Sequence, residues 1–411
     1  MAPANVVGFD EALASVSAHA ESLGAATEDL PLLQCRGRVL AEAIVADRDQ
    51  PPFDRSTRDG FAVRAEQLLP GASLTVVGQV RAGERWLGGS VEAGSAVEIM
   101  TGAPVPEGAD AVVMVEHVER AGDAIRLSAD RILRAGENVV PRGSEARAGS
   151  TVLGAGTVLE AAEIALAAAC GRPSLTVFRR PTVAIVATGD ELVELDKAPA
   201  EHQIRNSNSY GLAALVAHAG GEAVRLPIAP DRREELEQII RQARASDLML
   251  LSGGVSMGEY DLVEEVLLSL GAEFFFTGVR MQPGKPVVFG RLPASDGFSA
   301  RFFFGLPGNP VSTQVTFHCF VEPMLRAMAG AGVQGPRFVQ ATLAEEVARK
   351  PGLMRLLPAR LTTDRIKPTV RLVGWQGSGD LAANARANCY AVLPPEQEGF
   401  AAGDVITVLL R

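Results

Sequence analysis

Residues 247–258 read DLMLLSGGVSMG, an apolar run that passes directly into a glycine-rich loop. Two further stretches have the same construction: residues 181–192 read PTVAIVATGDEL, and residues 301–310 read RFFFGLPGNP. Short apolar runs bounded by glycine indicate buried strands of a parallel sheet. Because loops at the carboxyl ends of such strands bind ligands in α/β proteins, these stretches predict an α/β domain with a ligand-binding edge.

The loop at residues 252–256 is the most specific signal for anion binding. Glycine lets backbone N–H groups approach an anion closely, and a helix that begins after the loop adds positive potential at its N-terminus. Glu191 and Asp261 lie in or beside the glycine-rich loops. Carboxylates next to anion-binding loops indicate a bridging cation, so the loops predict a phosphate-bearing ligand held together with a metal.

Two other loops admit a ligand-binding and a purely structural interpretation. Residues 281–286 read MQPGKP, and prolines on both sides of Gly-Lys make a rigid loop that positions the charge of Lys285. The alternative is a solvated lysine in a turn, but the loop leads into an apolar strand, which favours a ligand role. Residues 305–312 read GLPGNPVS, with Asn309 as a candidate N-cap and Pro310 at the first helical position, so a tight strand-to-helix turn would also explain them.

The composition is that of a globular protein with several domains. A chain of 411 residues exceeds one hydrophobic core, so we expect three or four domains. The net charge of −10 argues against nucleic acid or an anionic membrane surface as the main partner. The scattered cysteines form no CxxC motif and indicate buried thiols in a reducing compartment. A signal peptide and a bilayer-spanning segment are both lacking from the sequence pattern, so a cytoplasmic location is expected.

Changes in periodicity divide the chain. From residue 180 to 330 strand-like and helix-like stretches alternate, which predicts a doubly wound sheet with helices on both faces. Helical spacing at residues 9–23 and 161–169 brackets the short β-type runs and glycine-proline turns of residues 47–142, which predicts an all-β insertion in a helical segment. Residues 334–411 alternate like strands without a clear helix, so we expect a small C-terminal β-barrel.

Six motifs occur in a fixed order, although each alone would be weak. They are RDGFA at 58–62, TGAP at 101–104, TGDEL at 188–192, SGGVS at 252–256, PGKP at 283–286 and GLPGNP at 305–310. In this combination the chain resembles the MoeA family of molybdopterin molybdenumtransferases, which includes the C-terminal part of gephyrin. The resemblance covers essentially the whole chain.

The resemblance implies four domains and an elongated homodimer. The expected bounds are 1–46 with 143–179 for a helical dimerisation domain, 47–142 for the insertion, 180–330 for the α/β molybdopterin-binding domain and 331–411 for the barrel. The implied reaction inserts molybdate into adenylylated molybdopterin and releases AMP with the help of Mg²⁺. Molybdopterin adenylyltransferase and molybdoenzyme maturation proteins are the implied partners.

The resemblance also assigns site residues. The implied catalytic residues are Asp59, Thr101, Glu191, Asp231 and Asp261, of which Glu191, Asp231 and Asp261 bind the metal. The implied substrate-binding residues are Thr188, Gly189, Asp190, Ser252, Gly253, Gly254, Ser256, Lys285, Pro286, Pro307, Gly308, Asn309, Ser312, Arg355 and Ser378. Hard oxygen ligands suit Mg²⁺, which uses only one or two carboxylates directly. By residue type alone, Asp231 and Asp261 could instead be helix caps.

The resemblance implies a site shared between subunits, because Asp59 and Thr101 belong to the insertion and the other acidic residues to the α/β domain. The chain also departs from the family pattern. Gln282 stands where many relatives have lysine, so one positive charge is missing from the loop. Arg142 and Arg355 are candidates for retaining the basic roles of segments that have otherwise changed.

Two other functions compete with this interpretation. Molybdopterin adenylyltransferase, which acts one step earlier, has a similar α/β domain and glycine loop, but it is a single small domain. A gephyrin-like scaffold would cluster other proteins, but that role accompanies a fused second α/β domain and a long linker. The insertion and the C-terminal barrel therefore favour the molybdate-inserting enzyme.

Overall fold

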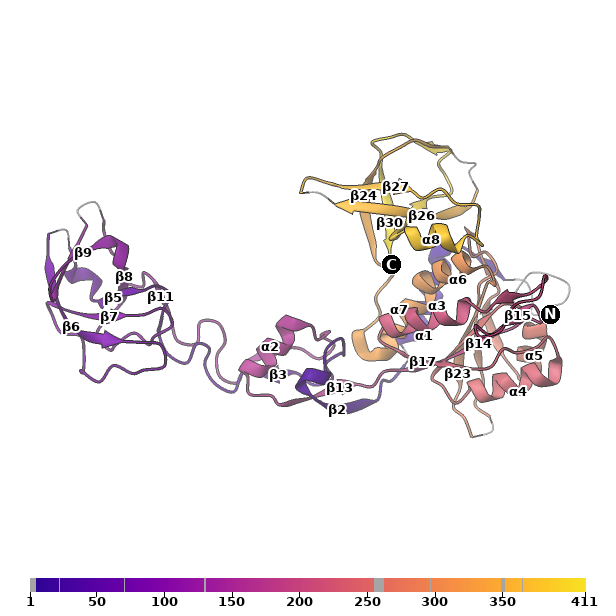
Figure 1. Ribbon diagram of the computed structural model, residues 1–411. Coiled ribbons are helices and arrows are strands. Elements are labelled where there is room, and N and C mark those ends of the chain that lie inside the picture. The colour runs from indigo at the N-terminus through magenta and orange to yellow at the C-terminus, as the bar shows by residue number, and fades with distance from the viewer. Residues whose placement is uncertain are drawn as a thin grey trace.

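The computed structural model describes residues 5–21, 23–69, 71–128, 131–254, 262–295, 297–348, 352–363 and 365–411. The described chain is elongated (Figure 1). A body at one end consists of residues 5–21 and 180–411, with the central sheet and the barrel. An arm made of residues 27–179 extends from it and ends in the insertion sheet.

A six-stranded sheet forms the centre of the body, in the order β17-β14-β18-β23-β22-β19. The first four strands run parallel, and β22 and β19 are antiparallel to their neighbours. The bounds are β14 Thr182–Ala187, β17 Glu222–Arg225, β18 Leu248–Ser252, β19 Glu273–Phe276, β22 Val288–Leu292 and β23 Arg301–Leu306. Every residue of β18 is buried, as expected for a strand covered on both faces.

Helices cover both faces of this sheet, which confirms the predicted doubly wound fold. On one face, α3 (Asn208–His218) and α6 (Pro310–Thr316) pack over a core that contains Phe289 and Phe304. The helical path continues through Phe317–Val321, α7 (Glu322–Arg326) and Ala327–Ala331. On the other face lie α4 (Arg233–Ala243) and α5 (Leu262–Ser269).

Helix α4 shows how the sequence determines this packing. Leu236, Ile240 and Ala243 recur at helical spacing and are buried against the sheet. Glu234 and Glu235 lie in the first turn, where a negative charge interacts favourably with the helix dipole. The apolar stripe therefore attaches the helix, and its charged face remains in water.

Helix α1 (Phe9–Glu21) packs on the body. Its residues Phe9, Ala12 and Val16 are buried in the same cluster as Phe320 of the long helical path. The bounds predicted from the sequence group α1 with the helical segment of the arm, whereas the structure places it against the α/β core. The apolar spacing of α1 identifies a helix but does not specify which neighbour the apolar face contacts.

The base of the arm contains one helix and two antiparallel strand pairs. Helix α2 (Ala161–Ala169) begins with a capping box in which Glu160 and Glu163 bond reciprocally with backbone N–H groups. The strand pairs are β2 (Thr27–Pro31) with β13 (Ser174–Phe178), and β3 (Ile44–Val45) with β12 (Thr151–Leu153). In this part of the chain the predicted helical character is found in α2 only. The strands were not predicted, because each pairs with a partner more than a hundred residues away and such pairing gives no local sequence pattern.

The predicted all-β insertion is confirmed as a six-stranded sheet in the order β8-β5-β7-β6-β10-β9. The bounds are β5 Gly60–Val63, β6 Ser73–Val80, β7 Ser95–Ile99, β8 Ala111–Met114, β9 Val118–Ala121 and β10 Ala124–Leu127. Phe61, Ile99 and Val112 are buried on its two faces. The end of the arm thus has its own core, so it can hold a loop rigidly far from the body.

The C-terminal residues form the predicted barrel. Strands β26, β27, β24, β30 and β28 pair in a ring that β28 closes onto β26. The bounds are β24 Phe338–Leu343, β26 Met354–Thr363, β27 Pro368–Leu372, β28 Cys389–Leu393 and β30 Val405–Leu410.

One helix of this domain was not expected from the sequence. Helix α8 (Leu381–Arg386) begins at Asp380, whose side chain accepts a hydrogen bond from the Ala383 N–H at 2.9 Å. The helix has only six residues, which is too short for a helical period to stand out in the sequence. The expectation of a domain without a helix was therefore wrong.

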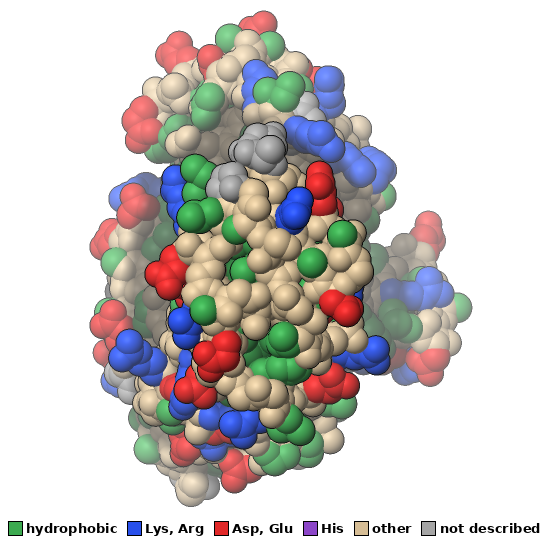
Figure 2. All heavy atoms as spheres, turned by 90° about the vertical axis from the view of Figure 1, so that its left-hand side faces the viewer, with side chains coloured by type: hydrophobic (Ala, Val, Ile, Leu, Met, Phe, Trp, Pro, Cys, Tyr) green, Lys and Arg blue, Asp and Glu red, His purple; other side chains and the backbone are tan. Residues whose placement is uncertain are grey.

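The cysteines Cys35, Cys170, Cys319 and Cys389 are buried and unpaired. Within the described ranges, no helix is both long and apolar enough to cross a membrane. On the face that Figure 2 shows, acidic and basic side chains are interspersed over the surface.

Candidate functional site

The loops that follow β14, β18 and β23 converge on a cavity of about 680 Å³. Its position at the carboxyl ends of parallel strands is the one expected from the glycine-rich loops. The predicted substrate-binding residues that line it are Thr188, Ser252, Gly253, Gly254, Pro286, Pro307, Gly308 and Asn309, and the predicted catalytic residue Glu191 lines it too. We call this the cleft.

The loop after β18 is shaped by two glycines. Gly253 and Gly254 have φ angles of 94° and 62°, which L side chains rarely adopt. A Cβ at Gly253 would lie 2.7 Å from the backbone oxygen of Thr188. The loop therefore packs against the neighbouring loop with no room for a side chain, and the Gly253 N–H holds it in place by donating to the Leu306 oxygen at 3.3 Å.

Several polar groups at this loop are arranged for a ligand. Asn208 donates from Nδ2 to Ser252 Oγ at 3.0 Å and to the Gly308 oxygen at 2.8 Å, so it joins two of the loops. The Thr188 hydroxyl is buried in the cleft wall and has no hydrogen-bond partner among the residues that the structure describes. A buried hydroxyl without a partner is costly, so it indicates a position where a ligand atom completes the bonding.

The loop after β14 brings two carboxylates together. The Asp190 N–H donates to Asp231 Oδ2 at 3.4 Å, and the Asp231 N–H donates to Asp190 Oδ1 at 3.3 Å. Asp231 therefore bonds with the loop that carries Glu191, and it does not cap α4, whose N-cap is Arg232. The cap alternative for Asp231 is thus not supported.

The donor set at this edge suits a hard divalent cation. Asp190, Glu191 and Asp231 supply only oxygen atoms, and Mg²⁺ prefers oxygen ligands and retains several waters. Ser256 and Asp261 lie outside the residues that the structure describes. Among the residues that it does describe, no group of three histidine, cysteine, aspartate or glutamate side chains forms a complete metal site.

The loop that leads into α3 contributes to the cleft, although the sequence motifs did not predict it. Arg205, Asn206 and Asn208 line the cleft, and the buried Asn206 Nδ2 has no hydrogen-bond partner within the described part of the chain. Asn206 also accepts a hydrogen bond from the Ser209 N–H at 3.2 Å, which fixes the start of the helix. The loop has no glycine-rich signature, and the only available signal is a run of polar residues before an apolar helix.

The barrel closes one side of the cleft. The Val311 N–H donates to the Ser378 oxygen at 2.9 Å, and Gly379 and Leu381 line the cavity. The side chain of Asn384 donates to Gln314 of α6 at 2.8 Å, which attaches α8 to the body. The predicted residue Ser378 therefore acts here through its backbone.

Some residues of the turn into α6 stabilise the start of the helix and do not face the cleft. Asn309 occupies the N-cap position with Pro310 after it, as predicted, but its side chain makes no capping bond. The Thr313 hydroxyl donates to the backbone oxygens of Pro307 and Asn309 instead. Ser312 is buried within the start of the helix and does not line the cleft.

The lysine loop lies at the edge of the cleft. Pro286 lines the cavity, whereas the Lys285 side chain is exposed beside it. Gln282, which replaces the family's lysine, pairs in register with Arg355 of the barrel, because β21 (Met281–Gln282) runs parallel to β26. The structure thus places the arginine Arg355 next to Gln282, the position at which many relatives have a lysine.

The two predicted residues of the insertion lie together but far from the cleft of the same chain. Asp59 Oδ1 accepts from the Thr101 N–H at 2.6 Å and from the Thr101 hydroxyl at 2.8 Å. These two hydrogen bonds hold the pKa of the exposed Asp59 below its ordinary value. Figure 1 shows β5 and β7, the strands next to these two residues in the chain, at the opposite end of the molecule from β14 and β23.

Comparison with known proteins extends over the whole chain. Residues 7–171 match the MoeA N-terminal region (domains I and II). Residues 184–327 match a probable molybdopterin binding domain, and residues 340–410 match the MoeA C-terminal region (domain IV). The first and last of these matches are therefore to regions of MoeA, and a match to a molybdopterin binding domain lies between them.

Individual relatives agree. A molybdopterin molybdenumtransferase from a Nostoc species is 37% identical over 93% of this chain and 88% of its own length. One from Staphylococcus aureus is 33% identical over 99% and 96%. A solved MoeA structure from Pyrococcus horikoshii is 30% identical, covers 99% of this chain and 100% of its own, and superposes with a TM-score of 0.81. The chain belongs to the MoeA family of molybdopterin molybdenumtransferases.

Proposed function

We propose that this protein is a molybdopterin molybdenumtransferase, which inserts molybdate into adenylylated molybdopterin and releases AMP. The observation that carries the proposal is the cleft. Its glycine loops present backbone N–H groups, its wall contains the unpartnered Thr188 hydroxyl, and carboxylates lie at its edge. This arrangement suits a ligand that contains a pyrophosphate bond.

The roles of the residues follow from their positions. Gly254 contacts the phosphate groups through its backbone N–H, and the side chain of Thr188 donates to the same ligand. Asn208 holds the loops after β18 and β23 in place, because both of its amide hydrogens bond to them. Because these donors are held before the ligand arrives, they stabilise charge on the phosphate as the bond to AMP breaks. Lys285 at the rim attracts the molybdate dianion, and Arg355 adds charge beside Gln282.

The carboxylates hold the cation of the reaction. Glu191, Asp231 and Asp261 are the proposed ligands of Mg²⁺, of which Glu191 lines the cleft and Asp231 bonds with the adjacent loop. When bound, Mg²⁺ would offset the negative charge of the pyrophosphate. Asp190 forms hydrogen bonds with Asp231 and so positions that residue.

The insertion completes the site of a second subunit. Asp59 and Thr101 are fixed to each other by two hydrogen bonds at the end of the arm, whereas the cleft of their own chain lies in the body at the other end of the molecule. A two-fold homodimer would bring the arm of one chain to the cleft of its partner and create two equivalent sites.

The remaining expectations are part of the same proposal. We propose the expected division into four domains, with the difference that α1 packs with the α/β domain. The protein is expected to work in the cytoplasm, to take its substrate from molybdopterin adenylyltransferase and to deliver the cofactor to molybdoenzyme maturation proteins. Neither nucleic acid nor a membrane is an expected partner.

The test of this function is genetic and chemical. Expression of this chain in cells that lack their own molybdenumtransferase should restore molybdoenzyme activity, and the purified chain should release AMP from adenylylated molybdopterin when Mg²⁺ and molybdate are present. An adenylyltransferase would consume ATP and unmodified molybdopterin instead. A scaffold protein would restore no molybdoenzyme activity. Failure of this chain to restore that activity would therefore contradict the proposed enzymatic function.

A further inference from the structure

A second cavity lies where the arm meets the body. It has a volume of about 330 Å³ and shares no lining residue with the cleft in the described part of the chain. Helix α3 connects the two, since Asn208 at its start lines the cleft and His218 at its end lines the second cavity. Eleven residues of helix span about 16 Å, so the two sites are separate.

The second cavity is lined by four arginines from different segments. Arg38 and Arg180 come from the arm and from its junction with the body, Arg326 ends α7, and Arg337 precedes the barrel. His218 adds a fifth group that can carry positive charge. Glu160 is the acidic residue of the lining, and its side chain is 3.5 Å from Arg36. The wall therefore carries more positive than negative charge.

Carboxylates beneath the wall neutralise only part of this charge. Arg326 and Arg337 share the buried Glu322, with Nη2 to Oε1 distances of 2.6 Å and 3.9 Å. Burial would raise the pKa of Glu322, but the hydrogen bond to His318 and the arginine charges outweigh it, so the pKa is lowered and the carboxylate stays ionised. Because Glu322 carries one negative charge and the two arginines carry two positive charges, one positive charge is not neutralised.

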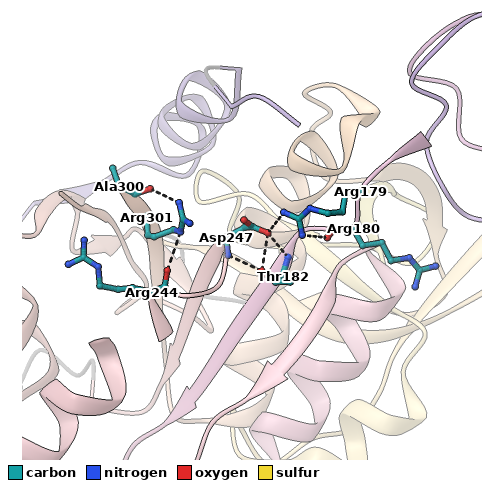
Figure 3. Close-up of polar contacts among 7 residues, drawn as sticks. All are labelled: Arg179, Arg180, Thr182, Arg244, Asp247, Ala300 and Arg301. Atoms are coloured by element: carbon teal, nitrogen blue, oxygen red, sulfur yellow. Dashed lines mark hydrogen bonds and ion pairs between the residues drawn. The ribbon is translucent and has the colours of Figure 1, made fainter. Parts of the chain in front are cut away.

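Arg180 has a cationic side chain available at the rim. The adjacent Arg179 is engaged with Asp247 at 2.9 Å, and Figure 3 shows the Arg180 side chain extending away from that cluster. Arg180 bonds to this cluster through its backbone oxygen, which accepts from Arg179. Arg38, in contrast, is buried and donates to Glu28 and to the Phe178 oxygen, so it shapes the wall.

We propose that this second cavity binds a phosphoryl oxyanion, either as a free inorganic anion or as the phosphate of a nucleotide. The planar guanidinium forks of Arg180, Arg326 and Arg337 approach from separate segments, and a tetrahedral anion with several charges can accept from all of them. The anion would bridge the arm and the body.

The experiment is a calorimetric titration of the full chain with pyrophosphate in the absence of Mg²⁺. The variants are Arg180→Glu and Arg180→Ala combined with Arg337→Ala. We expect the affinity of this site to fall at least about tenfold in each, because a hydrogen bond to a charged group is worth that much. Arg172→Ala, an exposed arginine near the end of α2, is the matched control and should bind as the unaltered chain does.

The variant Lys285→Ala shows whether pyrophosphate binds in the cleft or in the second cavity. Binding that survives Lys285→Ala but is lost in Arg180→Glu supports the second cavity. Binding that Lys285→Ala abolishes, or that Arg180→Glu leaves unchanged, overturns it, as does an absence of any binding. Since Arg180 is exposed, its reversal of charge does not threaten folding, which a thermal melt verifies. Comparison of pyrophosphate with AMP identifies the source, since tighter AMP binding indicates a nucleotide.

Discussion

At the scale of single residues, the cleft depends on groups that are fixed before a ligand arrives. Thr188 keeps an unpartnered hydroxyl in its wall, and Asn208 ties two loops together. At the end of the arm, Asp59 is likewise held by both donors of Thr101. Such fixed groups lower the cost of ordering the site when the substrate binds.

Lys285→Ala is expected to weaken molybdate binding by about tenfold to a hundredfold, because one charged donor is lost. Gln282 in the same loop has no charge to compensate, so the effect should be near the upper end. Calorimetric titration with molybdate measures it. Lys197→Ala removes an exposed lysine outside the cleft lining and is the control. Equal affinities of the two variants would remove Lys285 from the site.

Thr101→Val is expected to raise the pKa of Asp59 part of the way to its ordinary value. The variant loses the hydroxyl that stabilises the charged carboxylate but keeps the backbone N–H donor. If ionised Asp59 is needed, the acid limb of the rate of AMP release moves to higher pH. Thr157→Val, whose hydroxyl bonds within its own loop, is the control. An acid limb that stays in place would show that Asp59 does not govern it.

At the scale of elements, the sequence predicts the strands and the loops that end them. The parallel strands are recognisable because both faces are buried and their residues are apolar throughout. The glycine loops are recognisable because positive φ angles and close packing exclude other residues. The converging loops and the lining residue Glu191 therefore appear where the motifs place them.

Other elements could not be predicted, for reasons that are also physical. The polar loop at 205–208 contributes to the cleft through tertiary placement, and residue types in a loop do not reveal that placement. Helix α8 is stabilised by the Asp380 cap and by Asn384 bonding to Gln314, so it depends on the body against which it packs. The strand pairs at the base of the arm join distant residues in the same way.

Gly253→Ala is expected to impair the cleft through the loop after β18. The new Cβ would meet the Thr188 oxygen at 2.7 Å, and a φ of 94° adds strain of about 1–2 kcal/mol. Gly403→Ala is the matched control, because its φ is 98° and a Cβ there meets open space. Denaturant unfolding should show a loss of stability from the φ strain in both variants and a larger loss in Gly253→Ala because of the clash, whereas AMP release should fall only in Gly253→Ala. Normal activity in that variant would contradict a binding role for the loop.

At the scale of the whole molecule, one cluster anchors the arm on the body. Asp247, at the amino end of β18, accepts from the Thr182 N–H at 2.8 Å, the Thr182 hydroxyl at 2.9 Å and Arg179 at 2.9 Å (Figure 3). Arg179 is also where the arm joins the body, since its N–H donates to the Ala26 oxygen. The orientation of the arm is therefore tied to the central sheet.

The Asp247 carboxylate in this cluster makes the stability of the fold depend on pH. Burial would raise the pKa of Asp247, but the bonds from Thr182 and Arg179 outweigh it and lower the pKa. A carboxyl with a lowered folded-state pKa stabilises the fold above its unfolded value of about 3.9, and this contribution is lost as the pH falls further. Thermal melts of Asp247→Asn should therefore lose less stability than the unaltered chain as the pH falls from about 5 to 3.

Asp196→Asn, an exposed carboxylate in a loop, is the control for that comparison and should follow the unaltered chain. If Asp247→Asn shows the same acid dependence as Asp196→Asn, the cluster does not contribute to stability through the charge of Asp247. The anchoring of the arm would then rest on the packing of the junction alone.

The central proposal is that each active site is shared between two chains, and mixed dimers test it most directly. An Asp59→Asn chain and a Glu191→Gln chain, each inactive alone, are combined as heterodimers that are purified by two different tags. One of the two sites then contains both intact residues, so AMP release should recover to about half of the unaltered activity by symmetry. Verified heterodimers without recovered activity would contradict the shared site and place both residues in the site of one subunit.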